Sequence, residues 1–303
     1  MTYKSLYDMM KAFPTEESCI MHLEHLRWPK GVICPHCGSS RKIYRVSRSN
    51  SYKCSDCRKE FSVRKGTIFE ESRLPLRKWF AATWLVTSNR KGISSCQLAR
   101  EIGVTQKTAW FMLGRLREVA GVMGETGGPM NGIVEADETY LGSKEHNKHA
   151  SKRLKAGRGT VGKQTVIGAR ERNGKVKAQM TSNTDRESLH NFIKANVVVG
   201  STLYTDSHQG YLGLADYKHE SVNHSVGEYV RGMAHTNGIE SFWALLKRGY
   251  LGVFHQFSWK RLHRYLTEFE AWWNTSKQDE DVRMDSLLES VIDGQLTYKA
   301  LIA

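Results

Sequence analysis

The spacing of hydrophobic positions changes across a glycine-rich segment, residues 121–132, and this change predicts two kinds of structure. Before it, apolar residues recur three or four positions apart, as in 76–88 and 106–119, which is typical of amphipathic helices. After it, short runs such as 133–141 and 201–206 are rich in β-branched and aromatic residues, which favours strands. We therefore expect a helical region, a linker, and then an α/β domain built on a mixed sheet.

The last part of the helical region has the pattern of a helix-turn-helix. A short helix begins at Ser94 or Ser95 and is closed by Gly103, and Thr105 then caps a longer helix. In this module the first residues of the second helix contact base edges in the major groove of DNA. Here these residues are Gln106, Lys107 and Thr108. The residues expected nearer the phosphates are Arg115 and Arg117. The pattern also fits a small helical bundle that contacts no DNA.

The charge of the chain narrows the choice of partner. It has 45 Lys and Arg against 31 Asp and Glu, a formal net charge of +14, and such a surface attracts polyanions such as nucleic acid. A polar segment at 143–163 contains seven Lys or Arg residues, and we interpret it as a basic loop that follows phosphates through Lys152 and Arg153. Its alternative is a solvated loop without a role.

Four of the six cysteines form two C-x-x-C pairs, Cys34 with Cys37 and Cys54 with Cys57. Each pair can present two thiolates from one tight turn, and the spacing between the pairs is typical of a zinc ribbon. We expect one structural Zn²⁺ held by all four sulfurs, which leaves no open position for catalysis. Cys19 and Cys96 are expected to be buried free thiols.

Three acidic residues stand out in the α/β region. Asp137 lies within a predicted strand, Asp206 ends another, and Glu240 follows on a predicted helix. Brought together by folding, three carboxylates provide the oxygen ligands that Mg²⁺ prefers, and two such ions can serve phosphoryl transfer. Each acid taken alone is better explained as a cap or a solvated charge, so the prediction depends on the combination.

The residues around these acids add further expectations. On the helix of Glu240, the apolar stripe comprises Ile239, Phe242, Leu245 and Leu246. Its polar stripe comprises Asn237, Glu240 and Lys247. On the strand of Asp137, the flanking acids are Glu135 and Glu138. Because side chains alternate between the faces of a strand, we expect both to point away from Asp137 and neither to be a ligand.

The order of these motifs resembles bacterial insertion-sequence transposases that join an N-terminal zinc ribbon to a DDE-type catalytic domain. The matching segments are the C-x-x-C pairs and residues 134–140, 204–206 and 235–243 with Lys247. The resemblance implies an RNase H-like fold and cleavage and strand joining at inverted-repeat ends, with two Mg²⁺ or Mn²⁺ ions. Double-stranded DNA, as transposon end and as target, is the implied partner, bound by a homodimer or larger assembly.

Carried over by position, the resemblance makes Asp137 and Asp206 the first two metal ligands. The third is Asn237 or Glu240, and we favour Glu240 because it is ionised and lies 34 residues after Asp206. Lys247, seven residues later, is implied to contact DNA.

The resulting domain plan has five parts. They are an N-terminal helical segment at 1–30, a zinc ribbon at 31–66, a helix-turn-helix-like module at 67–122, the RNase H-like domain at 130–275, and a C-terminal tail at 276–303. No apolar run is long enough to span a membrane and the N-terminus lacks a signal peptide's apolar centre, so we expect a cytoplasmic, nucleoid-associated bacterial protein. Two alternatives stay open: a non-catalytic DNA-binding regulator and a structure-specific nuclease of the same fold.

Overall fold

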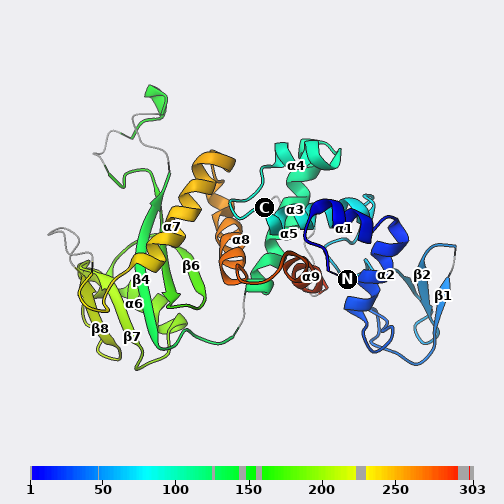
Figure 1. Cartoon of the computed structure of the whole chain (residues 1–303), viewed down its shortest axis with the longest axis horizontal. Coiled ribbons are helices and arrows are strands. Elements are labelled where there is room, and N and C mark those ends of the chain that lie inside the picture. Colours follow the sequence, from blue (N-terminus) through cyan, green and yellow to red (C-terminus); the bar gives the residue numbers. More distant parts are fainter. Residues whose placement is uncertain are drawn as a thin grey trace. The chain divides into compact units, whose positions relative to one another are not determined.

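The chain folds into two compact units (Figure 1). The computed structural model describes residues 2–46, 48–124, 127–142, 148–154, 159–222, 230–292 and 300. The first unit comprises Met1–Met123 together with Lys277–Ala303, and the second comprises Gly124–Ser276. The chain therefore leaves the first unit, completes the second, and returns to the first.

The first unit begins with helices α1 (Leu6–Ala12) and α2 (Glu16–Arg27). Thr15 caps α2, because its side chain accepts from the N–H of Ser18 while the Ser18 hydroxyl accepts from the N–H of Thr15. A small antiparallel sheet follows, with strands β1 (Ile43–Val46), β2 (Ser51–Cys54) and β3 (Glu60–Phe61).

Three longer helices make the rest of this unit: α3 (Leu76–Ser88), α4 (Ser95–Ile102) and α5 (Gln106–Gly124). Ser94 caps α4, and Gly103 closes it in the left-handed conformation with φ of 64°. Helix α5 begins after Thr105 as predicted, although it continues to Gly124 into the expected linker. Among the helices that the structure describes, none combines the length and apolar character that a membrane crossing requires.

Two expectations about this unit need correction. Cys96 is exposed, because α4 turns Leu98 and Ala99 toward the core and leaves Cys96 on its outer side. Cys19 is buried as expected.

The segment 276–303, which was predicted to be a C-terminal tail, contains helix α9 (Glu280–Ser290), and this helix packs against α3 and α2. Its buried residues include Met284, Leu287 and Leu288.

The second unit is built on a mixed five-stranded sheet in the order β6-β5-β4-β7-β8. Strands β4 (Ile133–Leu141), β5 (Gln164–Glu171) and β6 (Val176–Thr181) are antiparallel neighbours. Strands β7 (Thr202–Asp206) and β8 (Lys218–Val222) add to β4 in parallel. This is the mixed sheet expected of an RNase H-like domain, and β4 lies at its centre.

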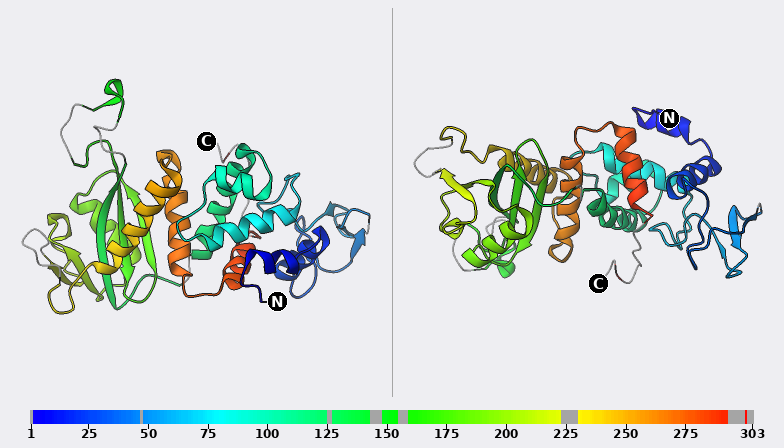
Figure 2. Two further views of the ribbon diagram at one scale, coloured as in Figure 1. Left: turned by 45° about the horizontal axis from the view of Figure 1, so that its top comes forward. Right: turned by 90° about the horizontal axis from the view of Figure 1, so that it is seen from below.

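Helices cover the two faces of this sheet (Figure 2). Helix α6 (Arg186–Asn196) covers one face, where its Leu189 and Ile193 join Val134 and Ala136 of β4 in the core. Helix α7 (Asn237–Gly249) crosses β4 and β5 on the other face. Even-numbered residues of β4 therefore face α6, and odd-numbered residues face α7.

Close packing between α7 and the sheet depends on Gly168 of β5. A Cβ atom at this position would lie 2.6 Å from the Trp243 side chain, so only glycine leaves room for the indole. Gly168 is also the direct partner of Asp137 across the β4–β5 ladder. The Trp243 ring is thereby seated beside Asp137.

A π-helical segment, Tyr250–Phe254, extends α7. Helix α8 (Leu262–Asn274) then packs against the edge strand β6. Glu270 accepts the N–H of Ala178, and Asn274 bonds both the N–H and the carbonyl of Val176. Side chains of α8 thus satisfy the backbone groups of an edge that another strand could otherwise join.

The packing of α9 predicts that the C-terminal segment stabilises the first unit. Leu287→Ala removes a side chain that is 1% exposed and should lower the free energy of unfolding by about 2–5 kcal/mol. The control Val282→Ala shortens a side chain of the same helix that is 48% exposed. It should change the free energy of unfolding by less than about 0.5 kcal/mol. Chemical denaturation of the full chain measures both, and equal effects would contradict the packing role of α9.

Candidate active site and metal centres

Asp137 and Asp206 lie on neighbouring parallel strands in matching register. The last recorded pair between β4 and β7 joins Glu135 to Tyr204, so two residues further along Asp137 stands beside Asp206. Paired residues of parallel strands point to the same face, and neighbouring strands are about 4.8 Å apart. Both carboxylates therefore belong to the α7 face, and the main-chain N–H of His208 holds one oxygen of Asp206 at 3.0 Å.

Helix α7 brings Glu240 to the same place. Trp243 of α7 donates from Nε1 to Oδ2 of Asp137 at 3.0 Å, and this bond ties the helix to the strand one turn after Glu240. The Thr236 hydroxyl donates to Oε1 of Glu240 at 2.8 Å and orients that carboxylate. Three acids that are distant in sequence are thus presented by β4, β7 and α7.

The electrostatics of Asp137 reflect this gathering of negative charge. Burial and the neighbouring charges of Glu138, Asp206 and Glu240 raise the pKa of Asp137 from 3.8 to about 7. Within the described residues, no ion pair to a basic side chain is recorded for Asp137 or Asp206. A cation bound among these oxygens would relieve the repulsion, so the donor set fits a hard divalent ion.

The spread of the three acids is wider than a single ion would require. In the part of the chain that the structure describes, the four paired cysteines alone form a set of possible ligands lying within 4.8 Å of one another. Two ions about 3.5–4 Å apart, each with oxygen ligands at about 2.1 Å, are spanned by carboxylates up to about 8 Å apart. The three acids therefore do not form a closed site for one ion, and an open arrangement that holds two ions is compatible with them.

The structure separates the two candidates for the third acid position. Asn237 is the first residue of α7 and is exposed, whereas Glu240 is half-buried and close enough to Asp137 to raise the pKa of that residue. This contrast supports Glu240. Lys247 is exposed two helical turns beyond Glu240, where it is accessible to DNA.

The expectation that Glu135 points away from Asp137 was wrong, because the alternation of side chains along a strand was misapplied to a spacing of two residues. Glu135 is two residues before Asp137, so both face α7, and Glu135 accepts N–H groups from Gly238 and Ile239 of that helix. Glu138 does lie on the opposite side, where its carboxylate accepts from the Tyr211 hydroxyl. The signal for Glu135 was present in the sequence as its spacing of two from Asp137.

The two cysteine pairs converge as predicted in the first unit. Sγ of Cys34 lies 3.6 Å from Sγ of Cys57, and Sγ of Cys37 lies 3.7 Å from Sγ of Cys54. Four thiolates around a tetrahedral metal at about 2.3 Å have sulfur–sulfur separations of about 3.8 Å. The cluster therefore has the dimensions of a four-thiolate metal site, and His36, which lies between Cys34 and Cys37 in sequence, is exposed.

The predicted DNA-reading residues at the start of α5 are accessible, but the arginines are not. Gln106 and Lys107 are exposed and Thr108 is half-buried. Arg115 and Arg117 are each only 5% exposed. The Arg115 guanidinium donates to the carbonyls of Ile68 and Glu70 and lies over the Phe111 ring. The prediction that these arginines contact phosphates is therefore corrected: both are buried, and Arg115 holds the segment before α3.

The basic loop is described only in part. Residues 143–147 and 155–158 lie outside the described residues, and so does the side chain of Lys152. Arg153 is exposed, and its Nε donates to the carbonyl of Lys148 at 2.9 Å. The assignment of Lys152 and Arg153 to DNA contact stays a prediction.

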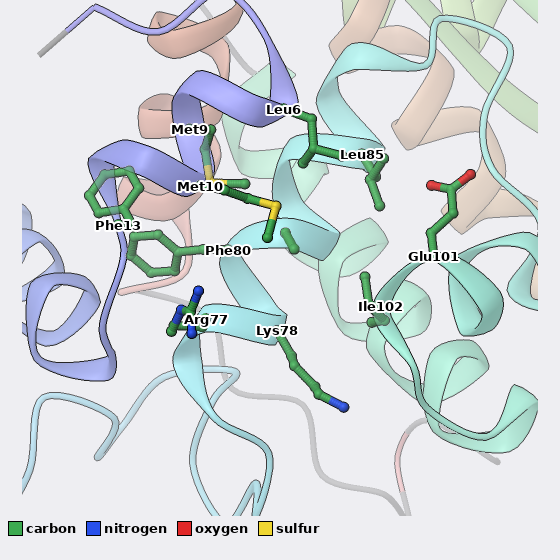
Figure 3. A pocket seen from close by; sticks show the side chains of 11 residues that line it. Leu6, Met9, Met10, Phe13, Arg77, Lys78, Phe80, Leu85, Glu101 and Ile102 are labelled. Atoms are coloured by element: carbon green, nitrogen blue, oxygen red, sulfur yellow. The ribbon is translucent and has the colours of Figure 1, made fainter.

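An apolar pocket of about 220 Å³ lies between α1, α3 and α4 in the first unit (Figure 3). Met9, Met10 and Phe80 line it, and Lys78 and Glu101 add charge. The acids of the second unit take no part in it, so this pocket is not the site of their chemistry.

The raised pKa of Asp137 predicts how stability depends on pH when divalent ions are removed. Because the folded pKa lies above the unfolded value, ionisation opposes folding, and stability falls as pH rises from about 4 to about 7. Asp137→Asn keeps the shape without the charge, so in chelator it should be more stable than the parent, by on the order of 2–4 kcal/mol at pH 8 and less at pH 5. Thermal melts across pH measure this, with exposed Asp216→Asn as the control, and a difference independent of pH would contradict it.

Two family models, one known protein and one solved structure are similar to parts or most of this chain. The model of the ISXO2-like transposase domain matches residues 129–274, and that of the transposase zinc-ribbon domain matches residues 14–60. A protein of Halobacterium salinarum, described as an uncharacterized protein in transposable element ISH50, is 32% identical over 300 residues, which are 93% of this chain and 99% of the relative. The crystal structure of the Mos1 strand transfer complex aligns with 73% of this chain and 81% of its own, at 13% identity and a TM-score of 0.28.

Two family models account for the cysteine cluster and for the domain that carries the acids, and the relative is similar along nearly the whole chain. The protein therefore belongs to the ISXO2-like family of insertion-sequence transposases that carry a zinc ribbon.

Proposed function

We propose that this transposase binds the terminal inverted repeats of its element and catalyses Mg²⁺-dependent DNA cleavage and strand transfer. The observation that carries the proposal is the convergence of Asp206 of β7 and Glu240 of α7 on Asp137 of β4, whose pKa is raised by burial and by the charges of Glu138, Asp206 and Glu240. A regulator that only binds DNA has no use for such a cluster, which disfavours folding wherever the acids are ionised.

Each acid has a distinct place in the proposed site. Asp137 is central and would contact both ions, while Asp206 and Glu240 would each hold one side. When bound, Mg²⁺ lowers the pKa of an attacking oxygen and stabilises charge on a leaving oxygen in phosphoryl transfer. Trp243 holds Oδ2 of Asp137, and Thr236 holds Oε1 of Glu240, so both carboxylates are oriented before DNA arrives. Lys247 would contact the phosphate backbone near the cleaved end.

The proposed DNA-binding surface lies on the first unit. The exposed Gln106 and Lys107 at the start of α5 have the position of base-reading residues in a helix-turn-helix. The zinc ribbon adds exposed basic residues for the phosphates: Arg41, Lys42, Arg45 and Arg48.

The central test is nicking of a duplex that contains the element's end. Asp137→Asn, Asp206→Asn and Glu240→Gln should each lose Mg²⁺-dependent nicking by on the order of 10³-fold, because each removes a ligand whose ion contributes several kcal/mol to transition-state stabilisation. Binding of the same duplex, measured by fluorescence anisotropy, should be retained. Asn237→Ala is the matched test of the third ligand and should nick far better than Glu240→Gln.

Other outcomes favour the alternatives. Duplex binding without nicking by the parent protein, over a range of Mg²⁺ and Mn²⁺ concentrations, would identify a regulator. Nicking of branched duplexes that lack the terminal repeat, with no strand joining, would identify a structure-specific nuclease. If Asn237→Ala is inactive and Glu240→Gln is active, Asn237 is the third ligand.

We also propose that the cysteine cluster holds one structural Zn²⁺. Elemental analysis of the purified full chain should find one zinc per chain, and Cys57→Ser should lose it and melt at a lower temperature, because a structural zinc contributes directly to folding. Cys96→Ser is the matched control, since Cys96 is exposed and outside the cluster. A chain that melts at the same temperature with and without zinc would contradict the structural role.

A further inference from the structure

A buried carboxylate next to the acid set joins the central strand to the helix of Glu240. Glu135 of β4 has an exposed side-chain fraction of 0%, and it is two residues before Asp137 on the same face. Its Oε2 accepts the N–H of Gly238 at 2.7 Å and that of Ile239 at 3.0 Å. These are donors of the first turn of α7, which need an acceptor because no earlier turn supplies one.

Two arginines compensate the buried charge of Glu135, and a histidine lies beside them. Arg172 lies 3.2 Å from Oε1, His235 lies 3.5 Å from Oε1, and Arg170 lies 3.7 Å from Oε2. Arg172 also donates to the carbonyl of Met233, so the chain leading into α7 is tied to the same cluster. The positive end of the helix dipole adds to this compensation, since a carboxylate at a helix N-terminus is stabilised.

The residue that would ordinarily cap α7 has another partner. Thr236 occupies the N-cap position, yet its side chain makes no capping bond and donates instead to Glu240. Glu135 thus supplies, from a strand about 100 residues earlier, the cap that Thr236 does not. This exchange leaves the threonine hydroxyl available to orient the proposed metal ligand.

Gly238 permits this close approach. A Cβ atom there would lie 1.5 Å from Nη1 of Arg170 and 2.5 Å from Oε2 of Glu135, so any side chain would displace the carboxylate or the guanidinium. Glycine within a helix costs about 1 kcal/mol relative to alanine, and this contact gives a physical reason to keep it.

Two bonds between β4 and α7 together locate Glu240. Residues 135 and 137 are about 7 Å apart along the strand, and residues 239 and 243 are about 6 Å apart along the helix axis. Glu135 joins the strand to the helix through its bond to Ile239, and Asp137 joins them again through its bond to Trp243. Glu240 therefore lies between two fixed points on the helix. Rotation or sliding of α7 would break at least one of these bonds.

We infer that Glu135 is a positioning residue that sets the distance between the carboxylates of Asp137 and Glu240. The inference rests on the proposed function, because it assumes that these two acids bind divalent ions. Glu135 itself acts through α7 and touches neither ion nor DNA.

The test compares two buried carboxylates of the second unit in the full chain. Glu135→Gln and Glu270→Gln each neutralise an acid that accepts a backbone N–H and lies within 4.0 Å of a basic side chain, so both should lower the melting temperature. Glu135→Gln alone should weaken Mn²⁺ binding, measured by electron paramagnetic resonance, by about 10-fold or more. It should also speed hydrogen exchange in peptides covering 236–243, and lower kcat for nicking while the duplex dissociation constant is unchanged.

A second variant keeps the charge of Glu135 and removes the space that its carboxylate needs beside α7. Gly238→Ala raises helix propensity, but its Cβ would collide with both the Arg170 guanidinium and Oε2 of Glu135, so it should also weaken Mn²⁺ binding. It serves as the test if Glu135→Gln does not fold. Equal Mn²⁺ affinity in Glu135→Gln and Glu270→Gln, or unchanged affinity in Gly238→Ala, would overturn the inference. Failure of the proposed function is distinguishable, because Mn²⁺ affinity would then be insensitive to Asp137→Asn as well.

Discussion

The attachment of α7 to β4 is the constraint on which the acid set depends. Two carboxylates about 5 Å apart repel each other by about 3 kcal/mol at an effective dielectric of about 20. Opposing this, α7 buries Ile239, Phe242, Trp243 and Leu246 against the sheet, each no more than 3% exposed. Full burial of such side chains contributes about 1.5–3 kcal/mol each, so the apolar face of the helix outweighs the repulsion. Apolar burial holds the helix on the sheet, and the polar bonds of Glu135 and Trp243 fix where along the strand it lies.

The site therefore stores electrostatic strain within a well-packed frame. The pKa of Asp137 is raised to about 7, so a large fraction of the molecules carries a proton there near neutral pH when no cation is bound. Binding of a divalent cation requires the ionised form, which couples metal affinity to pH and to the positions of Asp206 and Glu240. A site of this kind reduces the stability of the free protein and gains its function from the ion it recruits.

The sequence predicted most where the contacts are local. Each C-x-x-C pair lies in one turn, so the spacing alone predicted the four-sulfur cluster, and the helix caps at Ser94 and Thr105 were predicted from equally local patterns. The strands around Asp137 and Asp206 were visible as apolar runs, but their adjacency depends on the strand order, which no local pattern encodes. There the family resemblance carried the prediction.

The remaining differences come from partners distant in the chain. Arg115 lies in a basic helix and looked like a phosphate contact, yet it is buried because the carbonyls of Ile68 and Glu70 require a donor. Cys96 was predicted to be buried because a free thiol is usually apolar in its behaviour. Helix α4 instead buries Leu98 and Ala99 and leaves Cys96 exposed. In neither case does the local sequence predict the contacts that decide whether the residue is buried.

Glu135 is the instructive case, because the predicted face was wrong although its spacing of two from Asp137 was sufficient to give the right one. What spacing could not predict is its role, since that depends on a glycine in the first turn of a helix a hundred residues away. An acid on the site face of a central strand would ordinarily be counted as a fourth ligand. The structure shows instead that its oxygens are already taken by the α7 N–H groups and by Arg172. A carboxylate whose acceptors are filled cannot bind an ion without releasing the helix, and this separates Glu135, which holds the frame, from the proposed metal ligands.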